Sequence, residues 1–220
     1  MKSLFLLLPL LLAFTAPTKP TRVVFFGDSI TEAGARPGGY ILKIQEMLAK
    51  QNRAADYELI GKGIGGNKVY DLYLRMEDDV LALKPDVVVI YIGVNDVWHK
   101  STSGTGTDAP KFVKFYESLI RKIQAGGSKV ILCTPAVIGE RTDNSNEQDG
   151  DLNAYSTMIR ELAIKQNLPL VDLRKLFLDY NLQNNPTNKD RGILTTDRVH
   201  LNEAGNQFVA EQMLAAIEKK

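Results

Sequence analysis

Cysteine is nearly absent from this chain of 220 residues: Cys133 is the single thiol, and it stands in a short apolar run. One cysteine cannot close an internal disulfide, so an oxidising compartment is permitted but not required. We expect Cys133 to be a small buried hydrophobe. Histidine is almost as rare, with two residues, and no ligands occur in pairs at a metal-binding spacing. We therefore expect no metal, and chemistry that needs an imidazole has only two candidates.

An excess of either charge is also missing. Lys and Arg number 27 against 26 Asp and Glu, without a long run of like charge. This balance does not favour nucleic acid or an anionic membrane surface, so neither is expected as a partner. The hydrophobic share of 44% and the charged share of 24% are ordinary for a folded globular protein. With no internal repeat and no interdomain linker, residues 21–220 are expected to form a single domain.

Long apolar runs are missing except near the N-terminus, where Lys2 precedes an apolar stretch over residues 4–14. This stretch is too short to span a bilayer as a stable helix, and small residues and prolines follow it. The pattern predicts a secretory signal over residues 1 to about 16, within a leader and short linker over residues 1–20. We expect an exported protein, periplasmic or secreted, without stable membrane insertion after cleavage. An uncleaved N-terminal anchor is the alternative.

Short apolar runs alternate with helical patterns along the rest of the chain. The runs expected to form buried parallel strands cover residues 23–26, 57–60, 87–92, 129–133 and 170–172. Apolar residues three and four apart predict helices over residues 40–52, 69–83, 109–125, 150–167 and 202–219. This alternation predicts a three-layer α/β sandwich, in which ligands bind beyond the carboxyl ends of the strands. Two polar segments, residues 101–108 and 139–149, either line such a cleft or form solvated surface.

Polar residues follow the first and third of these strands. Asp28 and Ser29 come directly after the first, preceded by Gly27. A base at this edge can activate the Ser29 hydroxyl as a nucleophile, although a serine there is also a common turn or cap residue. After the third strand, Gly93 is followed two residues later by Asn95. The Asn95 amide is suited to stabilise an oxyanion, or merely closes a turn.

A glycine-rich segment follows the second strand. Gly61, Gly63 and Gly66 match the dinucleotide-binding pattern G-x-G-x-x-G. That pattern requires an acidic residue at the end of the next strand, about 20 residues on, whereas Asp78 and Asp79 fall inside an expected helix. The competing interpretation is that the backbone N–H of Gly63 faces an oxyanion, since glycine permits close approach.

An aspartate and a histidine near the C-terminus complete the candidate chemistry. Asp197 stands three residues before His200, directly ahead of the last expected helix. Its carboxylate can fix the tautomer of the imidazole and stabilise the imidazolium. A single Asp-x-x-His is weak as a motif, so its weight comes from the residues that accompany it.

The whole set has a recognisable order. Gly27-Asp28-Ser29, Gly63, Gly93-x-Asn95-Asp96 and Asp197-x-x-His200 resemble the four blocks of the SGNH/GDSL hydrolases, over residues 27–200. The resemblance implies a flavodoxin-like sheet of five parallel strands in the order 2-1-3-4-5. It implies Ser29 as nucleophile, His200 as general base oriented by Asp197, and an oxyanion hole formed by the N–H groups of Ser29 and Gly63 with the Asn95 amide. One departure is visible: the second block commonly opens Asn-x-Gly, where this chain has Gly61-Lys62-Gly63.

The resulting expectation is a serine esterase, without a cofactor, that removes small acyl groups such as acetyl from carbohydrate. The candidate substrate-binding residues are Asp28, Trp98 and His99. The Trp98 ring offers a flat face for a sugar, or packs under the loop that follows it. Lysophospholipase or thioesterase activity, a dinucleotide-binding oxidoreductase, and a non-catalytic carbohydrate-binding relative are the alternatives. A metal site on Asp28, Asp96 and Asp197 is a further one.

Overall fold

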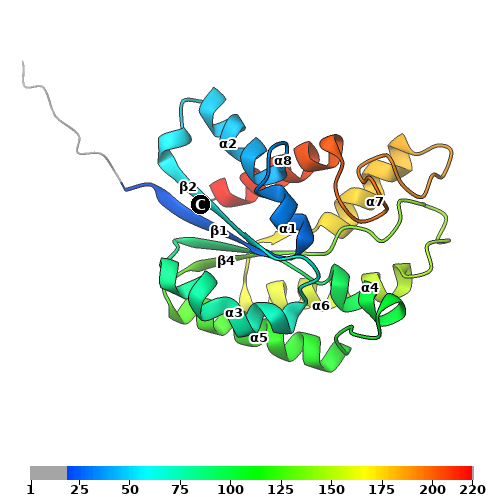
Figure 1. The fold of residues 1–220 in the computed structure, drawn as a ribbon, viewed down its shortest axis with the longest axis horizontal. Helices are drawn as coiled ribbons and strands as arrows, with labels where there is room; N and C mark the ends of the chain where they lie inside the picture. The colour runs from blue at the N-terminus through cyan, green and yellow to red at the C-terminus, as the bar shows by residue number, and fades with distance from the viewer. Residues whose placement is uncertain (1–18, 220) are drawn as a thin grey trace, which may run out of the picture.

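A parallel sheet runs through the middle of the computed structural model, which describes residues 19–219 (Figure 1). Its five strands are hydrogen-bonded in the order β2-β1-β3-β4-β5, and every neighbouring pair is parallel. The predicted order is therefore confirmed. The strands are β1 (Thr21–Gly27), β2 (Tyr57–Gly63), β3 (Val87–Tyr91), β4 (Lys129–Cys133) and β5 (Leu170–Val171).

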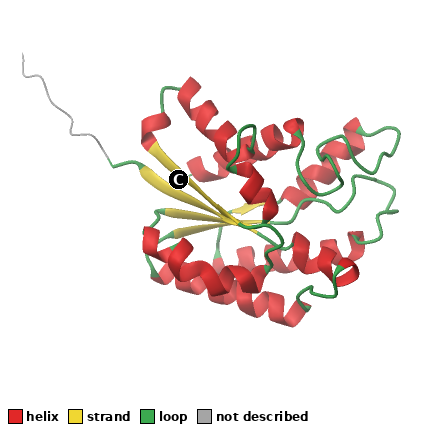
Figure 2. Cartoon of the chain, in the orientation of Figure 1, coloured by secondary structure: helices red, strands yellow, loops and turns green. Residues whose placement is uncertain are grey.

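Helices cover both faces of the sheet, so the predicted three-layer α/β sandwich is also confirmed (Figures 1 and 2). One face carries α1 (Ser29–Gly34), α2 (Tyr40–Lys50), α7 (Leu173–Asn184) and α8 (Glu203–Glu218). The other face carries α3 (Val69–Asp79), α4 (Val94–Thr102), α5 (Ala109–Ala125) and α6 (Asp149–Gln166). Two short 3-10 helices, Ala54–Asp56 and Leu81–Leu83, lie in the connections.

The central strand β3 explains why this sheet could be predicted. All five of its residues are buried, because helices cover the sheet on both sides, and its sequence is accordingly an unbroken apolar run. At the carboxyl end, Gly27 of β1 pairs with both Gly63 and Tyr91, and Tyr91 pairs with Cys133. Cys133 is buried and free, as expected. The residues that follow these strand ends are thus brought to one edge of the sheet.

Several boundaries differ from the sequence-based expectation. Strand β2 continues to Gly63 instead of ending at residue 60, because β1 extends to Gly27 and supplies partners for Gly61 and Gly63. Helix α3 ends at Asp79, and the rest of the expected helix is a separate 3-10 turn. Residues after the third strand form helix α4, which reaches Thr102 and so includes the start of the expected loop. The short helix α1 directly after Asp28 was not predicted.

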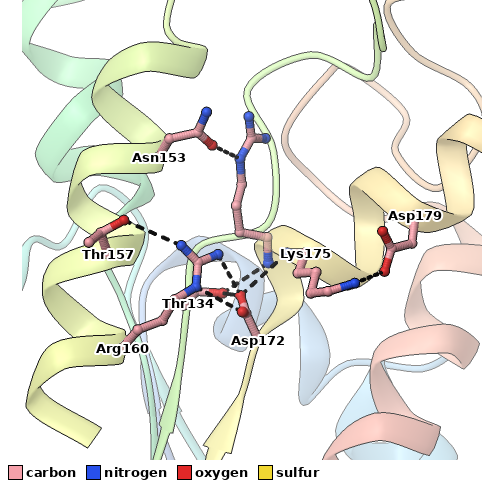
Figure 3. A network of polar contacts seen from close by, with 8 residues as sticks. Thr134, Asn153, Thr157, Arg160, Asp172, Lys175 and Asp179 are labelled. Carbon is pink, nitrogen blue, oxygen red and sulfur yellow. Dashed lines mark hydrogen bonds and ion pairs between the residues drawn. The ribbon is translucent and has the colours of Figure 1, made fainter. Parts of the chain in front are cut away.

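Helix α7 was also not predicted, and Asp172 fixes its start. The Asp172 carboxylate accepts the backbone N–H of Lys175 at 3.3 Å and receives bonds of 2.8 and 2.9 Å from the Arg160 guanidinium of α6 (Figure 3). The Thr134 hydroxyl, just after β4, donates to the same carboxylate at 3.1 Å. Partial burial opposes the charge, but these partners hold the pKa of Asp172 below its ordinary value. One aspartate therefore joins β4, α6 and α7.

The predicted secretory signal, residues 1 to about 16, lies outside the described residues. Within residues 19–219, each helix is too short or too polar to cross a membrane.

Candidate active site

Ser29 occupies the first position of α1, immediately beyond the end of β1. The preceding Asp28 is the N-cap: its side chain accepts the N–H of Ile30 at 3.0 Å, and its carbonyl accepts that of Glu32 at 2.9 Å. Gly27 allows close packing at this junction, because a Cβ there would overlap the carbonyl oxygen of Tyr91 in β3 and the hydroxyl oxygen of Thr31 in α1. The first N–H groups of a helix have no helical acceptor, so the N–H of Ser29 is a donor at this helix start.

His200 and Asp197 reach Ser29 from a segment 171 residues further along the chain. The Ser29 hydroxyl lies 2.9 Å from Nε2 of His200. On the other side of the imidazole, Nδ1 lies 2.7 Å from Oδ2 of Asp197. These distances are those of hydrogen bonds, and they place the three side chains in the order required for a base to take the serine proton and for a carboxylate to fix that base.

A tight turn holds Asp197 against His200. Oδ1 of Asp197 accepts the backbone N–H groups of Val199 and His200, at 3.1 and 2.8 Å. Partial burial alone would raise its pKa, but the His200 side chain and these two N–H donors hold the pKa of Asp197 below its ordinary value. Arg198 stands inside the turn with φ of 89°, a conformation that costs a non-glycine residue energy. The surrounding structure therefore has to impose this geometry.

Glu140 supports the segment that leads into this turn. This side chain is 1% exposed, and its carboxylate accepts the N–H groups of Ile193, Leu194 and Thr195 at 2.8, 2.6 and 2.9 Å. Next to it, the N–H of Gly139 donates to the carbonyl of Arg198 at 2.9 Å. The sequence carried no signal for this role, since Glu140 begins a polar segment that is indistinguishable from solvated loop.

Gly63 ends β2 beside the first turn of α1. A Cβ at this position would overlap the backbone nitrogen of Glu32, so only glycine lets the strand end approach α1 so closely. The chain then turns back over the serine: the N–H of Gly65 donates to the Glu32 carboxylate at 2.8 Å, and a Cβ on Gly65 would lie 4.0 Å from that of Ser29. The turn over residues 64–68 is therefore a wall of the site.

Asn95 lies in the first turn of α4 and is 2% exposed. Its amide nitrogen donates to the backbone carbonyl of Asn67 at 3.1 Å, which leaves its second N–H for another acceptor. The neighbouring Asp96 accepts the N–H of Val69 at 3.2 Å. These two contacts join the start of α4 to Asn67 in the turn over residues 64–68 and to the first residue of α3, at the carboxyl edge of the sheet where Ser29 begins α1.

A cavity of about 150 Å³ adjoins the Asp197–His200 turn. It is lined by Trp98, Ser101, Thr102, Ile138, Glu147, Gln148, Asp197, Arg198 and Val199. The Gln148 amide donates to the Ser101 hydroxyl. This bond joins the two polar segments, residues 101–108 and 139–149, for which the sequence allowed either a cleft or a solvated surface. Both segments contribute residues to this cavity, so they line a cleft as one interpretation of their composition anticipated.

Comparison with known proteins gives this arrangement a family. A model described as the GDSL-like Lipase/Acylhydrolase family matches residues 25–208. The chain belongs to this family. The resemblance inferred from the four sequence blocks is confirmed, and the chain is a carboxylic ester hydrolase.

Several known proteins are similar to the chain over most of its length. The crystal structure of an acetyl xylan esterase is 65% identical, with a TM-score of 0.88, and the match covers 89% of this chain and 99% of that one. The acetylxylan esterase of Geobacillus stearothermophilus is 31% identical over 214 residues, which are 89% of this chain and 93% of that protein. Catalytic mutants of an acetylxylan esterase from this organism, with a histidine, an aspartate or a serine changed to alanine, are 28% identical and cover 93% of this chain and 98% of theirs, with TM-scores of 0.80, 0.79 and 0.79.

The three candidate substrate-binding residues, Asp28, Trp98 and His99, have different surroundings. Asp28 is 2% exposed, and its observed contacts are those of a helix cap beneath Ser29. Burial, with the nearby charge of Asp96, raises its pKa to about 7. Trp98 and His99 lie three and four residues after Asn95 on α4, so they share its helix face. Trp98 contacts the His200 ring edge-on, with ring centroids 6.4 Å apart.

His99 is not among the residues that line the cavity. Its Cε1 would be 3.9 Å from a Cβ on Gly66, so the ring borders the turn over residues 64–68. Partial burial, together with the positive charge of Lys68, holds the pKa of His99 below its ordinary value. His99 is thereby favoured as a neutral ring beside the site.

The geometry gives little support to the two alternative ligand sites, one for a dinucleotide and one for a metal ion. Gly61 and Gly63 lie within β2, paired with β1, and do not form a turn that could cradle phosphate. In the part of the chain that the structure describes, no three His, Cys, Asp or Glu side chains are grouped as metal ligands would be. The carboxylates of Asp28, Asp96 and Asp197 are each engaged in separate backbone contacts.

Proposed function

We propose that this chain is an acetylesterase that removes acetyl groups from xylan-type carbohydrate, with Ser29 as nucleophile, His200 as general base and Asp197 as the residue that orients His200. The observation that carries the proposal is the unbroken chain of hydrogen bonds from Ser29 through His200 to Asp197. The same geometry supports a two-step reaction through a covalent acyl-enzyme.

In the first step, Nε2 of His200 takes the proton of the Ser29 hydroxyl while the serine oxygen attacks the ester carbonyl. The new oxyanion is stabilised by the N–H groups of Ser29 and Gly63 and by the free N–H of the Asn95 amide. As the tetrahedral intermediate collapses and the ester C–O bond breaks, His200 gives this proton to the departing sugar oxygen, so the sugar leaves as an alcohol and acetyl stays on Ser29. A water molecule repeats the cycle and releases acetate.

The carbohydrate part of the proposal is supported by similarity and by the walls of the site. An acetyl xylan esterase is 65% identical, and a second acetylxylan esterase is 31% identical over nearly its whole length. The cavity beside the Asp197–His200 turn is lined mainly by polar side chains, together with two aliphatic residues and one aromatic ring, Trp98, a combination suited to a sugar.

A substrate panel tests this function. The purified protein is assayed on p-nitrophenyl acetate, on butyrate and longer esters, and on acetylated xylo-oligosaccharides, with acetate release measured directly. We expect acetate and acetylated oligosaccharide to be turned over and kcat/KM to fall with acyl length. A preference for long acyl chains would replace this function with that of a lipase or lysophospholipase.

Trp98 tests the sugar-binding wall. A Trp98→Ala variant loses a flat apolar face beside His200. Aromatic pairs contribute about 0.5–1.5 kcal/mol beyond the buried area, and we take a sugar ring on Trp98 to contribute a similar amount. We expect kcat/KM for acetylated xylo-oligosaccharide to fall about tenfold, while p-nitrophenyl acetate, which is too small to need the platform, is hydrolysed as before. If both substrates are lost together with a lower melting temperature, Trp98 is a packing residue instead.

We further propose that residues 1 to about 16 direct export, as the basic residue and the short apolar run indicate. When the full chain is expressed, mature protein recovered from the periplasm or medium is expected to begin shortly after residue 16. An intact N-terminus on membrane-bound protein would instead identify the segment as an anchor.

A further inference from the structure

Arg75 of α3 is a half-buried arginine with nearly all of its donors in use. Its side chain is 16% exposed, and its guanidinium lies over the Phe26 ring, 4.5 Å from the centroid. The nitrogen Nε donates to the Asn67 side chain at 2.7 Å, and Nη1 donates to the Asp79 carboxylate at 2.6 Å. The nitrogen Nη2 donates to two backbone carbonyls, those of Gly27 at 2.7 Å and Lys62 at 3.1 Å. Four of its five N–H groups are thereby directed at fixed acceptors.

The two carbonyls belong to the strand ends that precede the proposed oxyanion donors. Gly27 ends β1, two residues before Ser29. The Lys62 carbonyl belongs to the same peptide group as the N–H of Gly63, so a hydrogen bond to that oxygen both fixes and polarises the group that presents this N–H. One nitrogen of Arg75 therefore joins the ends of β1 and β2, which are neighbours in the sheet.

Asn67, another acceptor of Arg75, connects Arg75 to Asn95, the third proposed oxyanion donor. The Asn67 side chain binds Nε of Arg75, and the Asn67 backbone carbonyl accepts the amide of Asn95 at 3.1 Å. The orientation of Asn95 therefore depends on a residue that Arg75 holds.

Asp79, which accepts Nη1 of Arg75, also keeps the guanidinium in place. Its other carboxylate oxygen accepts Nζ of Lys62 at 3.1 Å, so Asp79 binds both Arg75 and a residue of β2. A lysine at position 75 would keep the charge but would lack the planar fork that reaches three separate segments at once.

We infer that Arg75 is a positioning residue for the oxyanion hole, which holds the Ser29, Gly63 and Asn95 donors in register with one another. The inference rests on the proposed function, because the three donors matter only if an oxyanion forms at Ser29. Arg75 itself does not contact the reacting atoms.

The central test is a double-mutant cycle between Arg75→Gln and Asn95→Ala, with kcat and KM measured on p-nitrophenyl acetate. Misplacement of catalytic groups by about 1 Å costs on the order of 10²-fold in rate, so Arg75→Gln is expected to lower kcat by about 10- to 100-fold with KM little changed. Asn95→Ala alone is expected to lower kcat by about 10²- to 10³-fold. In the Asn95→Ala background the loss caused by Arg75→Gln is expected to shrink, because the two residues act through one another.

Two further variants separate positioning from folding. Asn67→Ala removes only the Nε acceptor and should lower kcat in the same direction by less, without a change in melting temperature. Arg22→Gln is the matched control, since Arg22 is also a half-buried arginine with an ion pair, to Glu58 at 2.7 Å, but lies at the amino end of β1. Its kcat, per folded molecule, should equal that of the wild type.

Several results would overturn the inference. These are an unchanged kcat in Arg75→Gln, an effect confined to KM, or losses from Arg75→Gln and Asn95→Ala that multiply independently. If Arg75→Gln does not fold, Asn67→Ala decides the question, and an unchanged kcat in that variant rejects the inference. Ser29→Ala is assayed beside them: if it retains activity, the proposed function fails and the inference with it, whereas an inactive Ser29→Ala with a normal Arg75→Gln rejects the inference alone.

Discussion

Changing Ser29 to alanine is expected to lower kcat/KM for acetyl esters by on the order of 10⁴-fold or more, because no other group then forms the acyl-enzyme. The side chain contributes little packing at the start of α1, and the cap provided by Asp28 remains, so the melting temperature should stay close to that of the wild type. Rates on p-nitrophenyl acetate and a thermal melt on the same preparation measure both effects.

Covalent labelling provides an independent measurement for the same residue. A fluorophosphonate should modify the wild type at Ser29 and leave Ser29→Ala unlabelled. Ser128→Ala is a suitable control, because the Ser128 hydroxyl donates to the Pro85 carbonyl at the amino end of the sheet and should not affect labelling. Retention of more than about a hundredth of the wild-type rate by Ser29→Ala would contradict its role as nucleophile.

Changing Asp197 to asparagine is expected to lower kcat by about 10⁴-fold while leaving substrate binding intact. The carboxylate now accepts the proton on Nδ1 of His200, which leaves Nε2 free to accept the serine proton. An amide in its place can present an N–H to Nδ1, and the imidazole proton then moves to Nε2, where it blocks proton transfer from Ser29. Steady-state kinetics should show the loss in kcat and little change in KM.

A control for Asp197→Asn is available on the same segment of the chain, at Asp190. Asp190 lies seven residues earlier, and among the described residues 19–219 its carboxylate makes long ion-pair contacts, of 3.9 Å, to Arg191 and Arg198. Asp190→Asn should therefore keep nearly full activity. An Asp197→Asn enzyme within tenfold of the wild type would mean that the backbone turn alone holds His200 correctly.

Residues whose chemistry is visible in local sequence were the ones that could be predicted. Ser29 follows a buried strand, and His200 has an aspartate three residues before it, so their residue types and positions at strand or helix boundaries made both of them candidates. The strands were equally visible, because a sheet covered on both faces requires uninterrupted apolar runs such as that of β3.

Residues that act through tertiary contacts could not be found in the same way. Arg75 stands on a helix whose pattern makes it an ordinary surface arginine, and only the fold shows that it lies over Phe26 between two strand ends. Helix α7 was missed because Asp172 was assigned to the end of a strand, although it is the N-cap of the next helix. In each case the information is carried by partners distant in sequence.

The buried carboxylate of Glu140 has a consequence for any attempt to retarget this enzyme by loop exchange. Residues 139–149 supply Glu147 and Gln148 to the cavity, yet the first two residues of the same segment support the turn that carries Asp197 and His200. A graft that replaces the whole segment to alter specificity would also remove the acceptor for three backbone N–H groups ahead of the histidine. Exchange confined to residues 141–148 leaves that support in place, so the boundary between an adaptable and a fixed part of the loop falls directly after Glu140.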